Sequence, residues 1–599
     1  MDVNDNELEV ERGATSDGLP VAPSMADSIH AARIPAERSL IDARVVVICA
    51  WAVVLALATG FIAQFLVALI GVVTNLAFYG CFSTKLVSPA DNHLGWLVLF
   101  IPVIGGLIVG VMARYGSKAI RGHGIPEAME QVLLNESRIP ARVTFLKPLS
   151  AAISIGTGGP FGAEGPIIAT GGALGSLVGQ LLKTSASERK TLLAAGAAAG
   201  MAATFGSPVS AVLLAIELLL FEFRPRSLVP VSLAAVTATA VRMAYAGTAP
   251  IFAMPLLARP TEEALAMYAL IGALVGWLSV YVTRAVYWIE DLFEHLPIHW
   301  MWWPAIGGLA VGAVGIVAPR TLGVGYDNIE GLVAGHFVGR AVLILCVFKF
   351  ISWSISLGSG TSGGTLAPLF TIGGGCGVIA GEVAARAFPS IGVDARICAL
   401  VGMAAMFAGA SRALLASVVF AFETTLQPLG LLPLLAGCTA GYLVSSLLMR
   451  NTIMTEKLAR RGVRVPSEYH ADYLDRIAVA DACSRDVITF RDTQTLGEVT
   501  AIVNSHQGFP VIDAANNLLG MITRRDVLGR DASTRIGELI HRPPAIVFPD
   551  SSLRDAADHM VREHVGRLVV VERDSPRRIA GIITRSDLLS AHARRLAED

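Results

Sequence analysis

The chain has 599 residues, of which 53% are hydrophobic and 16% are charged. Its mean hydropathy of +0.60 lies far above the range of water-soluble globular proteins and predicts a polytopic membrane protein in a lipid bilayer. The formal net charge of -1 gives no indication of a nucleic-acid partner.

The first 43 residues are polar and lack the basic, apolar and small-residue pattern of a cleaved signal peptide. We expect residues 1–43 to form a soluble tail.

Long apolar runs follow, and we predict a membrane domain over residues 44–455. Crossing a bilayer takes about 20 apolar residues. Shorter apolar pieces, broken by glycine, survive in lipid only when they pack inside protein or line a cavity, because an unpaired backbone group costs several kcal/mol there. The runs long enough to cross or deeply enter the bilayer are Val45–Leu69, Trp96–Val111, Leu192–Leu220, Leu265–Val282, Ala305–Val317, Ala341–Leu357 and Leu431–Leu448.

Three glycine-containing interruptions stand directly before renewed apolar helices. They are GHGIPEAME at Gly122–Glu130, GPFGAEGP at Gly159–Pro166 and SGGTLAP at Ser362–Pro368. Free N–H groups at a helix start, with the positive end of the helix dipole behind them, attract an anion, and glycine lets the ion approach the main chain. The interruptions therefore predict an anion site made of backbone groups, and the second one carries a single acid, Glu164.

An internal duplication becomes visible when the chain is shifted by 202 positions. The glycines and proline of the second interruption then fall on those of the third, and Lys147 falls on Lys349. After a short insertion, Glu217 corresponds to Glu423. We expect solute binding where the paired interruptions meet. The two lysines would add positive field there, with snorkelling to an interface as the alternative. We expect the first interruption to have no counterpart in the other half.

A second duplication lies beyond residue 475, where charges become frequent and the apolar runs become too short to cross a bilayer. Residues 508–528 and 566–589 each read as an apolar strand, a polar turn and a Thr-x-x-Asp motif that enters a helix. Thr523 and Asp526 match Thr584 and Asp587.

The tail resembles a pair of CBS domains, placed at 476–531 and 532–593 after a linker at 456–475. Family pairs that bind an adenine nucleotide hold its ribose through the matching acid, and helix capping is the alternative role of these residues.

The loops GHGIP (Gly122–Pro126), GAEGP (Gly162–Pro166) and GGTLAP (Gly363–Pro368) resemble the three anion-binding loops of the CLC family of chloride channels and proton-coupled exchangers. RNTIMTEKLARRG (Arg450–Gly462) resembles the stretch that closes the family's last membrane helix. The resemblance implies a mainly α fold with an inverted repeat of interrupted helices, followed by a cytoplasmic α/β CBS pair. It also implies a homodimer with one anion pathway per subunit, in a bacterial inner membrane, with both termini cytoplasmic.

The same resemblance assigns the gate to Glu164, whose carboxylate can occupy an anion site and swing away when it is protonated or displaced by chloride. The implied anion-binding set comprises Gly122, His123, Gly124, Ile125, Pro126, Ala163, Gly165, Thr365, Leu366, Ala367 and Met454.

Three members of this set depart from the family pattern. Ala163 replaces a basic residue, and His123 and Met454 replace residues that supply serine and tyrosine hydroxyls. A methionine sulfur cannot donate a hydrogen bond. A histidine can, which predicts a pH response, unless its side chain turns aside and only its backbone matters.

Leu218 stands where proton-coupled family members commonly carry a second acid, directly after the glutamate that aligns with Glu217. The missing acid, and the missing hydroxyl at Met454, favour a voltage- or pH-gated chloride channel. A proton-coupled chloride antiporter that moves protons through water or Glu217 is the alternative, because some exchangers lack the second acid. We expect no required cofactor, with chloride as the ligand and an adenine nucleotide as a candidate ligand of the CBS pair.

Membrane metalloproteases and divalent-cation transporters also carry CBS pairs. A metalloprotease requires a zinc-binding HExxH helix, which the sequence lacks, and Pro297 interrupts the nearest histidine pair. A cation transporter should place carboxylates in its membrane core, whereas the interruptions in this sequence present glycines and backbone N–H groups there. The sequence therefore predicts neither an enzyme nor a metal site.

Overall fold

The computed structural model describes residues 41–463, 465, 474, 477–503, 507–541, 543–575 and 577–598. These residues form two compact units, one within 41–469 and one within 470–599. We call them the membrane unit and the tail unit. Almost all of the predicted N-terminal tail, and most of the predicted linker after Gly462, lie outside the described residues.

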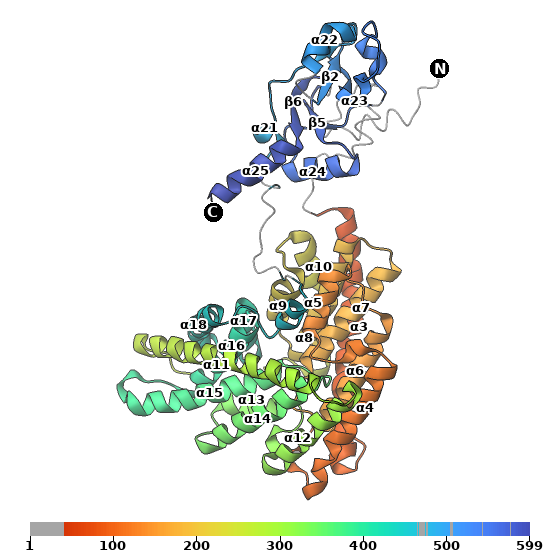
Figure 1. Ribbon diagram of the computed structural model, residues 1–599. Helices are drawn as coiled ribbons and strands as arrows, with labels where there is room; N and C mark the ends of the chain where they lie inside the picture. Colours follow the sequence, from red (N-terminus) through yellow and green to blue (C-terminus); the bar gives the residue numbers. More distant parts are fainter. Residues whose placement is uncertain are drawn as a thin grey trace. The chain divides into compact units, whose positions relative to one another are not determined.

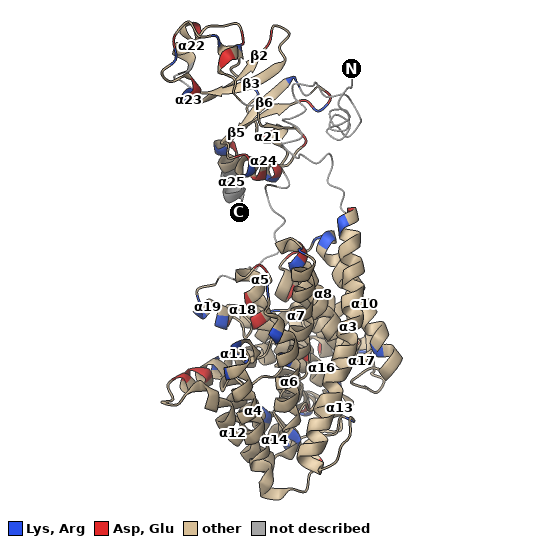
Figure 2. Cartoon of the chain, turned by 90° about the vertical axis from the view of Figure 1, so that its right-hand side faces the viewer, with Lys and Arg blue, Asp and Glu red and all other residues tan. Residues whose placement is uncertain are grey.

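The membrane unit is built from helices whose charged residues are sparse along the helix bodies (Figures 1 and 2). Its first half contains α3 (Ala43–Thr74), α4 (Ile101–Tyr115), α5 (Ile125–Leu134), α6 (Ala141–Gly156), α7 (Glu164–Leu181), α8 (Ala186–Phe205), α9 (Pro208–Ala215) and α10 (Pro225–Ala246). Its second half contains α11 (Glu262–Glu294), α12 (Trp303–Val317), α13 (Tyr326–Ala334), α14 (Arg340–Gly358), α15 (Leu366–Ala387), α16 (Ala395–Ser411), α17 (Leu414–Thr425) and α18 (Leu431–Leu448), and α19 (Glu456–Arg460) follows.

Within the described residues, eight helical segments are long and apolar enough to cross a membrane. Six of the predicted runs lie in such segments, whereas Pro225–Ala246 and Leu366–Ala387 were not among the predicted runs. The predicted run Leu192–Leu220 is divided between two helices. Gly206 ends α8 in the left-handed conformation, with φ of 66°, and α9 begins two residues later.

The duplication extends over the whole membrane unit, because α3–α10 correspond in order to α11–α18. The expectation that the first interruption lacks a counterpart is wrong. Gly122 and Gly124 (φ 84° and 97°) lead into α5, and Gly323 and Gly325 (φ 68° and 75°) lead into α13 in the same way. The two turns share little sequence beyond these glycines, because the turn requires positive φ and leaves the other side chains free to differ.

Lys147 and Lys349 fasten these two turns from equivalent positions. Lys147 Nζ donates to the carbonyls of Ile120 (2.9 Å) and Gly122 (2.8 Å). Lys349 Nζ donates to those of Thr321 (3.0 Å) and Gly323 (3.1 Å). Both lysines are buried, so neither extends to a membrane interface.

Glu217 and Glu423 cap helices of opposite halves. The Glu217 carboxylate accepts from the backbone N–H groups of Leu415 (3.0 Å) and Ala416 (3.1 Å) in the first turn of α17. The Glu423 carboxylate accepts from Val209 (3.0 Å) and Ser210 (2.9 Å) in the first turn of α9. Each acid thus neutralises free donors and the positive dipole end of the other half's helix.

The tail unit contains two three-stranded sheets with the same topology. In the first, β1 (Phe490–Arg491) is parallel to β2 (Gly508–Ile512), which is antiparallel to β3 (Leu518–Thr523). In the second, β4 (Ile546–Val547), β5 (Arg567–Val571) and β6 (Ile579–Thr584) repeat this arrangement. The helices are α21 (Val479–Ala482), α22 (Leu496–Val503), α23 (Arg524–Val527), α24 (Leu553–Arg562) and α25 (Arg585–Glu598).

The two sheets of the tail exchange their opening segments. Ser484, which precedes β1 in the chain, pairs with Ile582 of β6 through two backbone hydrogen bonds of 2.9 Å. Conversely, Ile536, which precedes β4, donates to the carbonyl of Gln494 beside β1 at 2.9 Å. The tail is therefore one interlocked module.

The reciprocal caps predict a matched loss of stability. Glu217→Gln and Glu423→Gln should each lower the free energy of unfolding by about 1–3 kcal/mol, because the amide replaces one charged acceptor by a donor that faces a backbone N–H. Thermal unfolding of the purified protein measures this loss, with Glu330→Gln on the exposed side of α13 as the control. A loss confined to one of the two caps would contradict their equivalence.

Candidate anion site

The three predicted loops meet at one place in the membrane unit. Gly162 N–H donates to the Gly364 carbonyl (3.2 Å), and Gly364 N–H donates to the Gly162 carbonyl (2.9 Å). Gly363 N–H donates to the Gly122 carbonyl at 3.4 Å. Backbone contacts between glycines therefore join loops that are far apart in the sequence.

Three helices begin at this junction, namely α5 at Ile125, α7 at Glu164 and α15 at Leu366. Pro126, Pro166 and Pro368 lie in their first turns, where a missing N–H costs little. The first-turn N–H groups of a helix have no partner within the helix, and its dipole adds partial positive charge. The junction can therefore stabilise an anion without a buried arginine.

Glu164 is the acid of the junction, and its side chain is 1% exposed. Its Oε1 accepts a hydrogen bond from the Tyr326 hydroxyl at 3.0 Å. Its Oε2 has no hydrogen-bond partner among the residues that the structure describes. The sequence did not point to Tyr326, which belongs to the other half and is the first residue of α13.

The free carboxylate oxygen lies in a space kept open by glycine. A Cβ added to Gly364 would lie 3.0 Å from Glu164 Oε2, and a Cβ on Gly162 would collide with the same atom. We call the space bounded by Gly162, Gly364 and Tyr326 the Glu164 site.

His123 lies beside Ile453, the chain neighbour of Met454. His123 is 7% exposed, and its Nδ1 has no partner within the described part of the chain. The ring faces the Ile453 carbonyl, which also accepts from the Tyr287 hydroxyl at 2.8 Å. Met454 is fully buried. A tyrosine hydroxyl is thus present beside position 454 although the residue itself has none.

An ion pair between Glu127 and Lys457, which the sequence did not reveal, holds the first loop in place. Glu127 Oε2 accepts from the Gly124 N–H at 2.7 Å, and Lys457 Nζ donates to Glu127 Oε1 at 2.9 Å. The signal for Glu127 was available, since an acid three residues after an N-cap forms a capping box. Lys457 comes from α19 and could not be placed without the fold.

The remaining predicted positions of the membrane unit are also buried. Ala163, Gly165, Thr365, Leu366 and Ala367 lie at the starts of α7 and α15. Leu218 is 4% exposed, in the turn of π-helix that follows α9.

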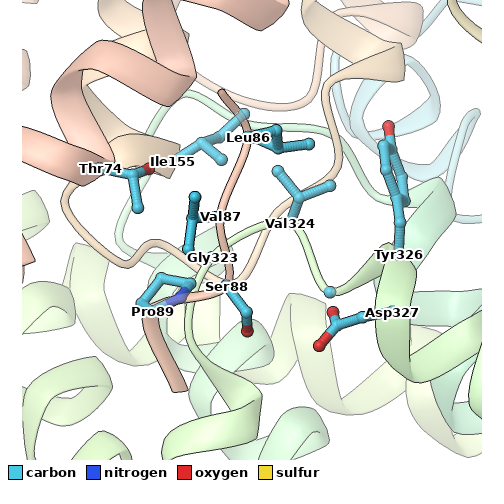
Figure 3. Close-up of a pocket in the computed structure, with 11 residues that line it drawn as sticks. Thr74, Leu86, Val87, Ser88, Pro89, Ile155, Gly323, Val324, Tyr326 and Asp327 are labelled. Carbon is cyan, nitrogen blue, oxygen red and sulfur yellow. The ribbon is translucent and has the colours of Figure 1, made fainter. Parts of the chain in front are cut away.

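A cavity of about 150 Å³ opens beside the start of α13. It is lined by residues 86–89 and 323–327 together with Thr74 and Ile155. Figure 3 shows Tyr326 and Asp327 on one side of it and Val87 and Pro89 on the other. We call it the α13 cavity.

The Thr and Asp residues of the tail act as helix caps. Asp526 Oδ2 accepts from the N–H and the hydroxyl of Thr523, both at 2.7 Å. Asp587 Oδ2 accepts from the same two groups of Thr584 at 2.7 and 2.8 Å.

The sequence profile described as "Voltage gated chloride channel" matches residues 105–446, more than half of the chain, and the profile described as "CBS domain" matches residues 479–533 and 536–594. The chain belongs to the CLC family. This membership confirms the predicted mainly helical CLC fold with an α/β CBS pair and the multi-pass membrane location. The CLC family is a family of transport proteins, as expected for a chain that is not an enzyme.

Individual CLC proteins resemble the chain over much of its length. The chain is 30% identical over 393 residues to the H(+)/Cl(-) exchange transporter ClcA of Salmonella arizonae. This match covers 63% of the chain and 82% of the relative. The chain is 28% identical over 561 residues to the chloride channel protein CLC-f of Arabidopsis thaliana, which covers 80% of this chain and 70% of the relative. A solved structure, that of a slow cyanobacterial Cl-/H+ antiporter, matches with a TM-score of 0.63 and 24% identity, covering 70% of this chain and 98% of that chain.

The space at Gly364 predicts the effect of one methyl group. Gly364→Ala should reduce chloride efflux from proteoliposomes at least about tenfold, because its Cβ would lie 2.5 Å from the Gly162 carbonyl oxygen and 3.0 Å from Glu164 Oε2, which forces the two loops and the carboxylate apart. Gly374→Ala in the same helix is the matched control, since its Cβ meets neighbouring atoms only at 3.5 Å and beyond. Normal efflux through the Gly364→Ala variant would show that the ion does not pass this point.

Proposed function

We propose that the protein moves chloride, or a related small anion, through a pathway gated by Glu164, and that it works as a voltage- or pH-gated channel. The observation that carries this proposal is the buried Glu164 carboxylate at the junction of three helix starts, with one oxygen unpaired among the described residues. A fixed carboxylate in an anion site excludes a free anion from that site. Its protonation or displacement would open the pathway.

The proposed anion-binding set is the one given by the sequence, with the backbone of the three loops as the main source of donors. Backbone donors are available whatever the side chains are, so Thr365 and Leu366 need no polar function. A charge that moves through the membrane field gains about 2.3 kcal/mol per 100 mV, which is enough to shift the population of a gate.

Two observations favour a channel over an exchanger. Leu218 is buried and cannot carry a proton. Both oxygens of the adjacent Glu217 accept backbone N–H groups of α17, which gives this acid a structural role. The alternative, a proton-coupled antiporter, is favoured by the names of relatives, since the Salmonella protein is an H(+)/Cl(-) exchange transporter.

We extend the proposal to a homodimer with one pathway per subunit, in a bacterial inner membrane, with both termini in the cytoplasm. The exposed leucines of α18, Leu432, Leu443 and Leu447, suit a partner subunit or lipid.

We also propose that the CBS pair binds an adenine nucleotide. The capping contacts engage one oxygen of Asp587 and leave the other for a ribose hydroxyl.

Reversal potentials separate the two modes of transport. In a planar bilayer, the current should reverse at the chloride equilibrium potential and should be unaffected by a pH gradient at constant chloride, because a channel moves no protons in step with chloride. A reversal potential shifted by the pH gradient would replace the channel by the antiporter. A chloride gradient without effect would remove the anion pathway altogether.

Replacement of the gate gives a second test. Glu164→Gln should open the pathway at neutral pH and abolish the response to acid, because the amide carries no charge and does not titrate. Chloride efflux at several pH values measures this effect, and Glu330→Gln is a control that changes an exposed acid of α13. Unchanged efflux and unchanged pH response would withdraw the gating role of Glu164.

A further inference from the structure

We propose that the Tyr326 hydroxyl is a ligand of the Glu164 site, where it holds the carboxylate in the closed pathway and a chloride ion once the carboxylate has left. This inference rests on the proposed anion pathway and names a donor within it.

The carboxylate marks an anion position, and its contacts are those that an anion would find there. Tyr326 Oη lies 3.0 Å from Glu164 Oε1 and donates to it. The backbone N–H of Ala367, in the first turn of α15, faces the same carboxylate. The second oxygen lies against the paired backbones of Gly162 and Gly364. Among the described residues, Tyr326 is the one side chain that donates a hydrogen bond to this group.

Aromatic packing fixes the direction of the hydroxyl. The Tyr326 ring meets the edges of Phe205 at 5.7 Å and Phe252 at 6.1 Å between centroids. Phe205 in turn packs on Phe420 at 4.9 Å, which packs on Phe370 at 5.1 Å. A tyrosine held in this way loses little further conformational freedom when its hydroxyl binds an ion. The donor is therefore ready for chloride as soon as the carboxylate leaves.

The duplication shows that the fold does not need this hydroxyl. Tyr326, the first residue of α13, corresponds to Ile125, the first residue of α5. Glu164, the first residue of α7, corresponds to Leu366, the first residue of α15. The same two backbone positions thus carry two apolar side chains in one pairing of the halves and a hydrogen-bonded polar pair in the other. The polar pair is an addition to the fold, which indicates a role in the pathway.

Tyr326 also connects the Glu164 site with the α13 cavity, which its side chain lines (Figure 3). Lys349 lies behind the turn that precedes Tyr326, where a Cβ on Gly325 would be 3.2 Å from Nζ. Asp327 lines the cavity from the exposed surface of the unit. Tyr326 thus contacts the Glu164 carboxylate with its hydroxyl and lines the α13 cavity with the same side chain.

The contribution of the Tyr326 hydroxyl to chloride binding can be measured in a variant that lacks the Glu164 carboxylate. Chloride binding to purified Glu164→Ala is compared by titration calorimetry with binding to Glu164→Ala/Tyr326→Phe. We expect the double variant to bind about tenfold more weakly, the size of effect that one hydrogen bond to an ion produces. The phenylalanine keeps the ring and its aromatic contacts, so the fold is retained.

Glu164→Ala/Tyr268→Phe is the matched control. Tyr268 is buried in the membrane unit, and its hydroxyl accepts a hydrogen bond from the Asp394 N–H at 3.0 Å. Its loss should leave chloride affinity within about twofold of Glu164→Ala. Equal affinity of Glu164→Ala and Glu164→Ala/Tyr326→Phe would overturn the role of Tyr326 while leaving the anion pathway in place. No chloride binding to Glu164→Ala itself would overturn the pathway and the ligand together.

Discussion

Backbone pairing between Gly162 and Gly364 is the contact on which the site depends. It joins the starts of α7 and α15, one from each half of the duplicated unit, at a distance that only residues without side chains allow. Because the two helix starts are fixed against each other, their free N–H groups and positive dipole ends converge on one small volume. A single carboxylate can then be buried there, since the surrounding dipoles offset part of its lost hydration.

The duplication supplies the interrupted helix start twice, but only one of the two copies carries an acid. Lys147 and Lys349 fasten equivalent turns, and Glu217 and Glu423 cap equivalent helices across the halves. These contacts are symmetric, as expected for groups that build the scaffold. Glu164 is asymmetric, because Leu366 occupies the corresponding place. Comparison of the halves therefore separates residues that hold the fold from the residue for which we propose a role in the pathway.

The sequence was sufficient for the features that depend on spacing and composition. It predicted the three loops, the duplication and the CBS pair, since glycines before helices and Thr-x-x-Asp motifs leave local signatures. It failed where the contact partner comes from a distant segment. Tyr326 and Lys457 reach the junction only because α13 and α19 fold against it, and no local pattern names their contact partners. The counterpart of the first loop was missed because two glycines in a turn are too little to align.

The exchange of segments in the tail has a consequence for how the module folds. Ser484 pairs with β6 of the second sheet, and Ile536 donates to the Gln494 carbonyl of the first half, so neither half contains all of its own backbone partners. Removal of residues from Ile536 onward would leave Ser484 and Gln494 without these hydrogen bonds. The two halves therefore fold as one unit, and a chain cut between them would lose the backbone hydrogen bonds that each half takes from the other.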